Sequence, residues 1–600
     1  MDNVRKILTP SAVWNGFKGD LPLKDSKVHE MTYDGITYAE VYFSGREINS
    51  SRVRIYGLYA RPNPLPSNRK IGAVLILPDF CDTINLELVN HFAKMGYAVL
   101  MVDYRGDVGD NANHTIYPSE IEYANYGKED MFRVERDAKE TCWHEWACVA
   151  KYAISYLKSR VEVDKIALIG IKQGANVGWQ TLYKESRIEC FVSLFGAGWQ
   201  AYKGVFKSEG TDISMDDERY RWLGGVDAHV YAQYCKCPVL YLTATNSPDF
   251  DCERGIETIS RVQRSTSKGA EKDAEKTGEK EEENKENPPK PEVEVEPIKC
   301  TFNYSPRLKD TIDKKSADDI ALFLKKYLTK AGALTDRLYF PASPALFLAI
   351  DNEKKTAFAE VIIAEEDKLK GLTVYMSEGI ADPAKRNWCQ MVSVKNKNTA
   401  NRKYFKLPLG GACDFINAFA VVDYKNGVSV SSRMVMKKIE NPLPAIPANM
   451  LYSSRSGIDC FTVCDELSNS VGKIFFNENV GVELAECANG ITGVTSRYGL
   501  LNYRIVEKRF NPTERSIIKS DIYCEDYTKL KVSLVLIENG QKCEYSTFIE
   551  LKGSKVWQKI QIDLAGLKDE NRIGIKNYEN IVALKFEASS RFAVNNILLI

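Results

Sequence analysis

The sequence predicts an α/β domain, a mostly parallel sheet with helices on both faces, followed by two all-β sandwich domains. Three observations predict this fold class. Short, fully apolar segments such as "GAVLILPDF" and "YAVLMVDYRG" alternate with helical segments up to about residue 333. Beyond that point, short segments of alternating polarity are separated by turn residues, without long helical patterns. At 600 residues, the chain is also too long for one hydrophobic core.

The α/β domain is predicted for residues 1–333. Residues 34–62 alternate as in a β-hairpin or meander, and "GAVLILPDF" follows as a strand buried on both faces. The helix "INLELVNHFAKMG" comes next, then the strand "YAVLMVDYRG". The helix "TCWHEWACVAKYAISYLKSR" leads to the strands "VDKIALIGI", "CFVSLFGAG", "CPVLYLTAT" and "VEPIKCTFNYS", and "SADDIALFLKKYLTKAG" is the closing helix. Strands that alternate with helices of this length indicate βαβ units and therefore a mostly parallel sheet.

A Glu/Lys-rich segment, residues 265–297, interrupts this domain. It contains no aromatic residue and almost no large apolar one. Such a composition cannot bury enough apolar surface to fold, so we expect a solvated, disordered insertion between two strands. A regulatory or docking segment is the other interpretation.

Two β-sandwiches are predicted for residues 334–442 and 450–600. "TAFAEVIIAEEDKLKGLTVYMSEG" and "INAFAVVDYKNGVSVSSRMVMKKI" are alternating strands typical of an immunoglobulin-like sandwich. The Pro-rich "ENPLPAIPAN" is a plausible linker. The last part ends in the strands "KVWQKIQIDLAGLK", "IVALKFEAS" and "FAVNNILLI", which favour a jelly roll of galactose-binding-like architecture.

Charge and composition exclude several function classes. Lys+Arg and Asp+Glu are both 81, so the basic excess of a nucleic-acid-binding protein is absent. The N-terminal residues show no apolar region of signal-peptide length, and we find no apolar run long enough to cross a membrane. The 15 cysteines are scattered and read as reduced thiols. We therefore expect a cytoplasmic protein, without a metal or cofactor, since no Cys/His metal cluster or phosphate-binding loop is evident.

The segment "KIALIGIKQGANVGW" carries the most specific motif. An apolar strand runs into Gly170-Ile171-Lys172-Gln173-Gly174 and then into a helical segment that begins near Ala175. This strand, turn and helix have the form of the nucleophile elbow G-x-S-x-G, whose glycines allow a tight turn and close packing of the helix. The central residue, however, is Lys172 instead of Ser.

Together with "LILPDFCD" and "LMVDYRGDVGD", which follow two earlier strands, this elbow makes residues 30 to 330 resemble the α/β-hydrolase superfamily. Within it, the chain is most similar to the dienelactone hydrolase and acetyl xylan esterase-like branch. The resemblance covers about half of the chain. It implies ester hydrolysis by a nucleophile at the elbow, a carboxylate after the seventh strand and a His after the eighth.

The three triad positions are degenerate in this sequence. Lys172 replaces the nucleophile, Ser247 in "TATNSPDFD" aligns with the acid, and Pro306, next to Ser305, aligns with the base. All five histidines precede the seventh strand: His29, His91, His114, His144 and His229. We therefore predict a pseudoenzyme with no catalytic residues of the usual kind.

Other interpretations stay open at this point. The chain could be an active carboxylic-ester hydrolase that uses unusual groups, such as His114 from the loop after the fourth strand together with Asp249. Lys172 could act covalently through a Schiff base, since a partly desolvated amine at a helix N-terminus can become nucleophilic. Lys172 could instead simply pair with a carboxylate such as Asp79. Cys81 is a weaker nucleophile candidate, because no base accompanies it.

A ligand site is predicted at the carboxyl ends of the parallel strands, because the loops there form the pocket of such sheets. An aromatic stacking face with oriented polar groups would suit a small polar ligand or a carbohydrate. Trp199 could equally be a core anchor, and the oligomeric state is open. The candidate ligand residues are Asp79, Phe80, Arg105, Lys172, Gln173, Trp199, Tyr202 and Asp249.

Overall fold

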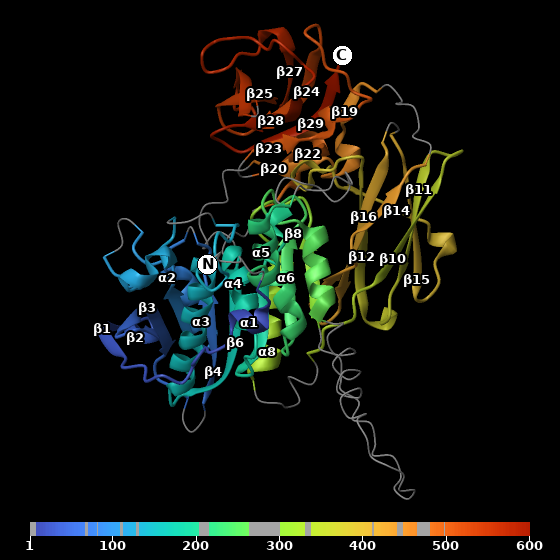
Figure 1. The fold of residues 1–600 in the computed structure, drawn as a ribbon. Helices are drawn as coiled ribbons and strands as arrows, with labels where there is room; N and C mark the ends of the chain where they lie inside the picture. The colour runs from blue at the N-terminus through green and yellow to red at the C-terminus, as the bar shows by residue number, and fades with distance from the viewer. Residues whose placement is uncertain are drawn as a thin grey trace, which may run out of the picture.

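The structure of this chain is a computed structural model that describes residues 8–66, 70–80, 82–108, 112–127, 131–202, 215–262, 300–329, 338–410, 413–440, 448–464, 481–496, 499–539 and 541–600. These residues form an α/β domain and two β-sandwiches (Figure 1), so the predicted fold class is confirmed. The Glu/Lys-rich segment 265–297 and Cys81 lie outside the described residues, and what was predicted for them stays a prediction.

The described strands of the first domain are β1 (Ser26–Tyr33), β2 (Ile36–Ile48), β3 (Ser51–Pro62), β4 (Ile71–Leu77), β5 (Ala98–Asp103), β6 (Val163–Ile171), β7 (Ile188–Leu194), β8 (Val239–Ala244) and β9 (Cys300–Ser305). They form one sheet in the order β1-β2-β3-β5-β4-β6-β7-β8-β9. The strands from β4 to β9 pair in parallel, whereas β1, β2 and β3 form an antiparallel meander that joins the sheet at β5. The exposed strand β1 is the one strand here that the sequence pattern did not predict.

Helices cover both faces of this sheet. They are α1 (Pro10–Val13), α2 (Leu86–Lys94), α3 (Cys142–Ser159), α4 (Gln173–Thr181), α5 (Asp217–Gly225), α6 (Ala228–Tyr231) and α8 (Lys314–Leu328), and residues 252–262 are also helical. Successive strand residues point to opposite faces, so Leu75 of β4 packs in the core with α3 and α4, and Val74 in the core with α2 and α8. Side-chain caps begin the long helices: Asn85 starts α2, Thr141 α3 and Asp313 α8.

The second domain consists of two packed antiparallel sheets. Its strands are β10 (Ala345–Asp351), β11 (Thr356–Ile362), β12 (Leu369–Glu378), β13 (Cys389–Gln390), β14 (Val392–Ser393), β15 (Arg402–Pro408), β16 (Phe415–Tyr424), β17 (Ser429–Ser431) and β18 (Val435–Lys438). One sheet has the order β10-β11-β15-β14, and the other has the order β13-β12-β16-β17 with β18 also paired to β16. The core of this sandwich is continuous with the α2 and α8 face of the first domain.

The third domain is a second sandwich with a core largely its own. Its strands are β19 (Met450–Tyr452), β20 (Phe461–Val463), β21 (Glu483–Glu486), β22 (Thr492–Thr495), β23 (Leu500–Asn502), β24 (Ile517–Cys524), β25 (Thr528–Glu538), β26 (Gln541–Leu551), β27 (Trp557–Asp563), β28 (Ile581–Glu587) and β29 (Phe592–Leu599). The sheets have the orders β21-β22-β29-β24-β27, with β19 on β29, and β20-β23-β28-β25-β26. Alternation explains the burial: Ile518 and Ile522 of β24 are buried, and Lys519 between them is exposed.

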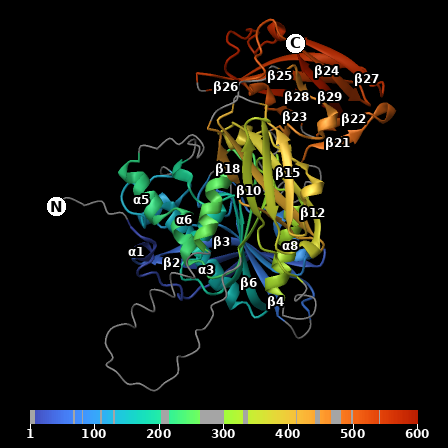
Figure 2. The same ribbon diagram turned by 90° about the vertical axis from the view of Figure 1, so that its right-hand side faces the viewer.

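The second domain contacts the loops after β8 and β9, and the third domain contacts the loop after β9. Figures 1 and 2 both place the second sandwich beside the α/β domain and the third above the two. No helix among the described residues has both the length and the apolar composition needed to cross a lipid bilayer.

Candidate functional site

The turn between β6 and α4 has the geometry of a nucleophile elbow. Lys172 has φ 53° and ψ −116°, a conformation that non-glycine residues rarely adopt and that costs roughly 1–3 kcal/mol. Glycines make this turn possible. A Cβ on Gly174 would overlap the carbonyl oxygen of Leu77, and one on Gly196 would overlap the carbonyl oxygen of Lys172. The strand order and this turn together identify the fold. The first domain has the fold of an α/β hydrolase.

The main-chain donors of this hydrolase fold are already occupied. In the fold, the oxyanion of the reaction binds to the backbone N–H after the nucleophile and to another N–H from the loop that corresponds to the one after β4 here. Here those groups are the N–H of Gln173 and the N–H of Phe80. Both donate to Oδ1 of Asp79, over 3.2 Å and 2.9 Å. A carboxylate oxygen of the chain itself therefore occupies the position of the oxyanion.

Burial and the nearby positive charge shift the pKa of the Asp79 carboxyl group in opposite directions. Burial raises the pKa of Asp79, and the nearby Lys172 ammonium and the two N–H donors partly offset that increase. The neighbouring Asp82 is half-buried, and its pKa is raised to about 6, mainly by burial and then by the charge of Asp79. Lys172 and Arg105 lower the pKa of Asp82. The Lys172 ammonium thus offsets part of the pKa increase that burial causes at these two carboxyl groups. Whether it pairs with one of them stays a prediction.

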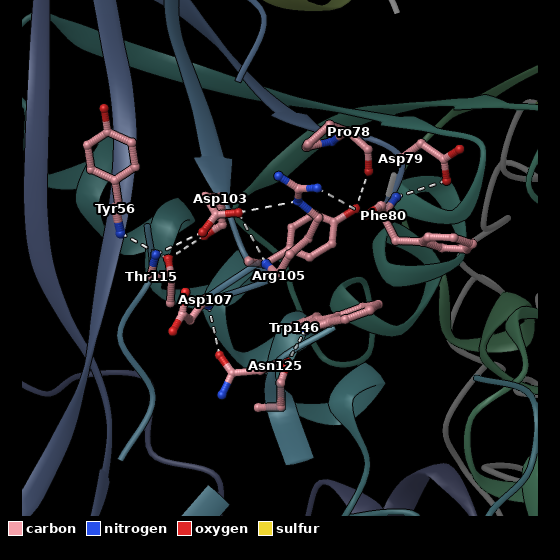
Figure 3. A network of polar contacts seen from close by, with 12 residues as sticks. Tyr56, Pro78, Asp79, Phe80, Asp103, Arg105, Asp107, Thr115, Asn125 and Trp146 are labelled. Atoms are coloured by element: carbon pink, nitrogen blue, oxygen red, sulfur yellow. Dashed lines mark hydrogen bonds and ion pairs between the residues drawn. The ribbon is translucent and has the colours of Figure 1, made fainter. Parts of the chain in front are cut away.

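Arg105 belongs to a buried polar network and is not open to a ligand (Figure 3). Its guanidinium lies 3.5 Å from Asp103 and donates to the carbonyl oxygen of Phe80 over 3.4 Å. Asp103 also accepts from the N–H of Thr115 over 2.8 Å, and the Thr115 hydroxyl accepts from the N–H of Tyr56 over 3.0 Å. This network fixes the loops after β4 and β5, so Arg105 acts as a positioning residue for the Asp79 loop.

The predicted acid position, Ser247, is a buried structural residue. Its hydroxyl accepts from the N–H of Phe250 over 3.2 Å and so closes the turn after β8. The adjacent Asn246 donates to the carbonyl oxygen of Arg386 in the second domain over 2.9 Å. Asp249, in contrast, is exposed. The loop that would carry a catalytic acid is thus attached to the second domain.

The predicted base position, Pro306, precedes a residue that joins all three domains. Arg307 donates through Nε and Nη2 to the carbonyl oxygen of Trp388, over 3.0 Å and 2.8 Å, in the second domain. Its Nη2 also lies 2.5 Å from Oδ1 of Asp459 in the third domain. The carbonyl oxygen of Arg307 accepts from the hydroxyl of Thr462. Where an active enzyme of this fold carries its His, this chain has an interdomain joint.

The structure places the candidate histidines differently from the sequence-based hypothesis. The backbone of His114 lies beside β2, where its carbonyl oxygen accepts from the Tyr42 hydroxyl, and three strands separate β2 from the elbow strand β6. His229 was not selected from the sequence. Its Nδ1 lies 2.8 Å from Oδ1 of the buried Asp227, and its ring stacks on Trp199 at 4.3 Å between centroids. The Asp-x-His spacing is the only signal that could have indicated this pair.

Trp199 and Tyr202 follow β7, as predicted, but protein groups already contact Trp199. Besides the stack on His229, its indole N–H donates to the Thr258 hydroxyl over 3.0 Å. The guanidinium of Arg261 lies 5.4 Å from the centre of its ring system. Tyr202 is half-buried at 5.8 Å from Trp199. These contacts favour Trp199 as a packing residue. Tyr202 is half-buried like Trp199, and the guanidinium of Arg254 lies 5.0 Å from the centre of its ring.

Metal-binding residues do not gather in the part of the chain that the structure describes: no group of three His, Cys, Asp or Glu side chains lies close enough to share an ion. The polar groups of the site are engaged with one another, as the preceding contacts show.

Comparison with known proteins gives likenesses in structure alone. No protein-family model matches the chain, and no curated protein sequence matches it. Among solved structures, an acetyl xylan esterase from a Paenibacillus species is similar with 14% identity, 53% of this chain and 92% of that chain covered, and a TM-score of 0.36. Acetyl xylan esterase 1 from a Thermoanaerobacterium species is similar with 14% identity, 51% and 89% coverage and a TM-score of 0.33. A glucuronoyl esterase from Solibacter usitatus shows 13% identity, 53% and 90% coverage and a TM-score of 0.34.

Proposed function

We propose that this chain is a non-hydrolytic protein with an α/β-hydrolase fold, which binds a small polar ligand or carbohydrate at the carboxyl edge of its parallel strands. One observation carries the non-hydrolytic part of this proposal: Oδ1 of Asp79 accepts hydrogen bonds from the N–H groups of Gln173 and Phe80. Acyl transfer needs those donors free, because they stabilise the negative charge that develops on the carbonyl oxygen. A carboxylate at that point blocks and repels such an oxyanion.

The residue at the elbow supports the same proposal. Lys172 supplies no hydroxyl or thiol, and its ammonium lowers the pKa of both Asp79 and Asp82. An ammonium at this position stabilises a buried carboxylate, whereas an ester hydrolase needs a nucleophile that a base can deprotonate. Lys172 is thus explained as the electrostatic partner of the group that fills the oxyanion position.

Several accessible side chains around the elbow support ligand binding. Phe80 is half-buried, and its ring stacks on Tyr126 with 5.2 Å between centroids. Lys172 and Tyr202 are half-buried, and Asp249 is exposed. Aromatic faces beside a cation and a carboxylate offer stacking and oriented hydrogen bonds, which a sugar or another small polar molecule uses.

A second candidate is an ester hydrolase with an unusual base, and the Asp227 and His229 pair favours it. A buried carboxylate that accepts from Nδ1 of a His performs the orienting role of the acid in a catalytic triad. The pair lies on the segment after β7, outside the usual triad positions. His229 therefore replaces His114 as the histidine to test.

Ester turnover separates these two candidates. We expect the purified chain, Lys172→Ala and His229→Gln to hydrolyse p-nitrophenyl acetate no faster than buffer. Lys172→Ser is expected to stay inactive as well, because Asp79 still occupies the oxyanion donors. Turnover that His229→Gln abolishes would establish the second candidate. Turnover that Lys172→Ala abolishes would make the lysine the catalyst, and borohydride trapping with a carbonyl compound would then detect its Schiff base.

Ligand binding is tested on the same proteins with a panel of neutral and acidic oligosaccharides. If Lys172 contacts the ligand, Lys172→Ala should weaken binding about tenfold or more, since a hydrogen bond to a charged group contributes about 1.5–3 kcal/mol. Lys158→Ala, an exposed lysine in the last turn of α3, is the matched control and should bind like the unmodified chain. Binding that is equal in both variants would place the ligand elsewhere, and no binding to any saccharide would refute the carbohydrate part of the proposal.

A further inference from the structure

Two cysteines face each other across the junction of the second and third domains. Sγ of Cys389, on β13, lies 3.5 Å from Sγ of Cys460, in the turn before β20. Because 71 residues separate the two positions in the chain, their proximity depends entirely on how the domains pack. A disulfide has an S–S bond of about 2.05 Å, so the bond requires the two sulfur atoms to approach by only about 1.5 Å.

The junction also shifts the pKa values of the two thiols in opposite directions. The two thiols share a hydrogen bond, which lowers the pKa of the Cys460 thiol. The nearby Arg504 guanidinium acts in the same direction, whereas burial and the carboxylates of Glu507 and Asp459 oppose it. Cys460 has φ 71°, a backbone conformation that is uncommon for a residue with a side chain. A second thiol and a cation beside a cysteine are typical of a reactive cysteine pair.

An oxidant can reach this pair through a small cavity. A cavity of about 140 Å³ is lined by both cysteines, by Arg504 and Arg509, and by Asp459. One water molecule occupies about 30 Å³ in the liquid, so the space admits a molecule as small as hydrogen peroxide. Cys389 is half-buried and Cys460 is buried, which leaves the cavity as the approach.

We propose that Cys389 and Cys460 form a redox-sensitive disulfide site that takes a small hydroperoxide as oxidant and covalently joins the second and third domains. The Cys460 thiolate attacks one peroxide oxygen, the O–O bond breaks, and Cys460 becomes a sulfenic acid. The hydroxide that leaves takes the proton of the Cys389 thiol and becomes water. The Cys389 thiolate then attacks Sγ of Cys460, the S–O bond breaks, and the second hydroxide takes up the proton that Cys460 had released. In sum, two thiols and hydrogen peroxide give a disulfide and two waters, and two electrons pass from sulfur to the peroxide.

The bond would act at the point where all three domains are joined. Asp459, the residue before Cys460, binds Arg307 of the first domain and accepts from the N–H of Gln390, the residue after Cys389, over 3.1 Å. Oxidation would therefore add a covalent link beside an existing ionic one. Reduction would remove this covalent link and leave the junction to its noncovalent contacts, which include the packing of Val463 in the core shared by the first two domains.

The chain contains a matched internal control. Sγ of Cys235 and Sγ of Cys237 lie 3.8 Å apart, almost the same separation, but both side chains are buried in the α/β domain. The pKa of Cys237 is raised by the hydrogen bond with Cys235 and by burial, and the pKa of Cys389 in the junction pair is raised in the same way by Cys460 and burial. Proximity is thus shared by the two pairs, whereas Arg504 and the cavity belong to the Cys389 and Cys460 pair.

Peptide mapping of the full chain tests the proposal. The reduced protein is treated with hydrogen peroxide, alkylated, digested and analysed by mass spectrometry. We expect a Cys389–Cys460 cross-linked peptide that dithiothreitol reverses, with Cys235 and Cys237 recovered as alkylated thiols. In Cys389→Ser the cross-link should be lost and dimedone should label Cys460 as the sulfenic acid; in Cys460→Ser neither product should form. Recovery of both junction cysteines as free thiols, or a Cys235–Cys237 bond that forms equally fast, would overturn the proposal.

Discussion

The elbow after β6 and the joint after β9 lie at the same edge of one sheet, yet they have been changed in different ways. At the elbow the backbone geometry of a hydrolase is present and only the side chain differs, with Lys172 in a strained conformation. At the joint, Arg307 binds the carbonyl oxygen of Trp388 and the carboxylate of Asp459, in two other domains. The first region has the backbone shape of a nucleophile elbow with Lys172 at its centre, and the second is part of the domain assembly.

Packing explains this difference. The elbow is fixed by glycines that have backbone atoms directly against them, so its shape is required for α4 to pack against the sheet whether or not the chain is an enzyme. The loops after β8 and β9 have no such requirement. Asn246 and Arg307 could therefore acquire contacts to Arg386 and Trp388 without disturbing the sheet. Elbow geometry alone is consequently weak evidence for catalysis.

The largest expected effect is at the joint. Arg307→Ala should lower the free energy of unfolding by about 3–5 kcal/mol. It leaves the buried carbonyl oxygen of Trp388 without its donor and the half-buried carboxylate of Asp459 with only the N–H of Gln390 as partner among the described residues. Thermal unfolding and limited proteolysis between the domains would measure this loss. Arg402→Ala is the matched control: it breaks a 2.6 Å ion pair with Glu360 that is largely exposed, and the expected loss is about 0–1 kcal/mol. Equal effects of the two substitutions would mean that the joint is not a stabilising contact.

The next largest effect is at the elbow backbone. Alanine at position 174 would add helix propensity to α4, but its Cβ would overlap the carbonyl oxygens of Leu77 and Pro78. Gly174→Ala should therefore destabilise the chain by about 2 kcal/mol or more, as overpacking does. Denaturant unfolding would measure it, with Gly566→Ala as the control, since a Cβ there meets no atom within 4 Å. A stabilised Gly174→Ala variant would contradict the packing explanation of the elbow.

A smaller change in the free energy of unfolding, of opposite sign, is expected at Lys172, the central residue of the elbow. Lys172→Gly removes a strain of roughly 1–3 kcal/mol, while the added chain entropy of glycine costs roughly 0.5–1 kcal/mol. The variant also loses the ammonium that offsets the burial of Asp79 and Asp82, so the net gain in the free energy of unfolding should be at most about 1 kcal/mol. Lys158→Gly, in the last turn of α3, should instead lose about 1 kcal/mol. A loss at both positions would show that the Lys172 ammonium contributes more stability than its backbone strain removes.

The smallest effect is a pH dependence at Asp82. Its pKa is raised from the ordinary 3.8 to about 6, so the folded chain binds the proton more tightly than the unfolded chain does. Stability therefore falls as the pH rises from about 4 to about 6 and stays lower above pH 6. Asp82→Asn should gain about 0.5–1 kcal/mol at pH 7.5 after allowance for solvent screening, and nothing near pH 3.5. Unfolding curves at both pH values would measure this, and an equal gain at both would exclude titration as the cause.

Local sequence patterns predicted most of the first domain. Fully apolar runs predicted the parallel strands, and the glycine spacing predicted the elbow, because both depend on neighbouring residues. The exposed strand β1 was missed, since an edge strand without a buried face has no apolar alternation to reveal it. The occupied oxyanion position was missed as well: Asp79 was selected as a ligand residue, but its contact with the N–H of Gln173 joins positions 94 residues apart. The cytoplasmic location and the ligand class stay predictions.

The sequence by itself determined the α/β-hydrolase fold class, the two β domains and the absence of a Ser at the elbow, because strand periodicity, turn glycines and residue identity are local properties. Only the tertiary structure decided what surrounds the positions where an enzyme of this fold carries its triad. Asp79 reaches the donor groups, His229 meets Asp227 against Trp199, and the position after β9 became a joint, through contacts whose partners are set by domain packing. The chemistry at the carboxyl ends of the parallel strands depends on which surfaces the two sandwiches cover. The spacing of residues in the sequence does not encode this packing.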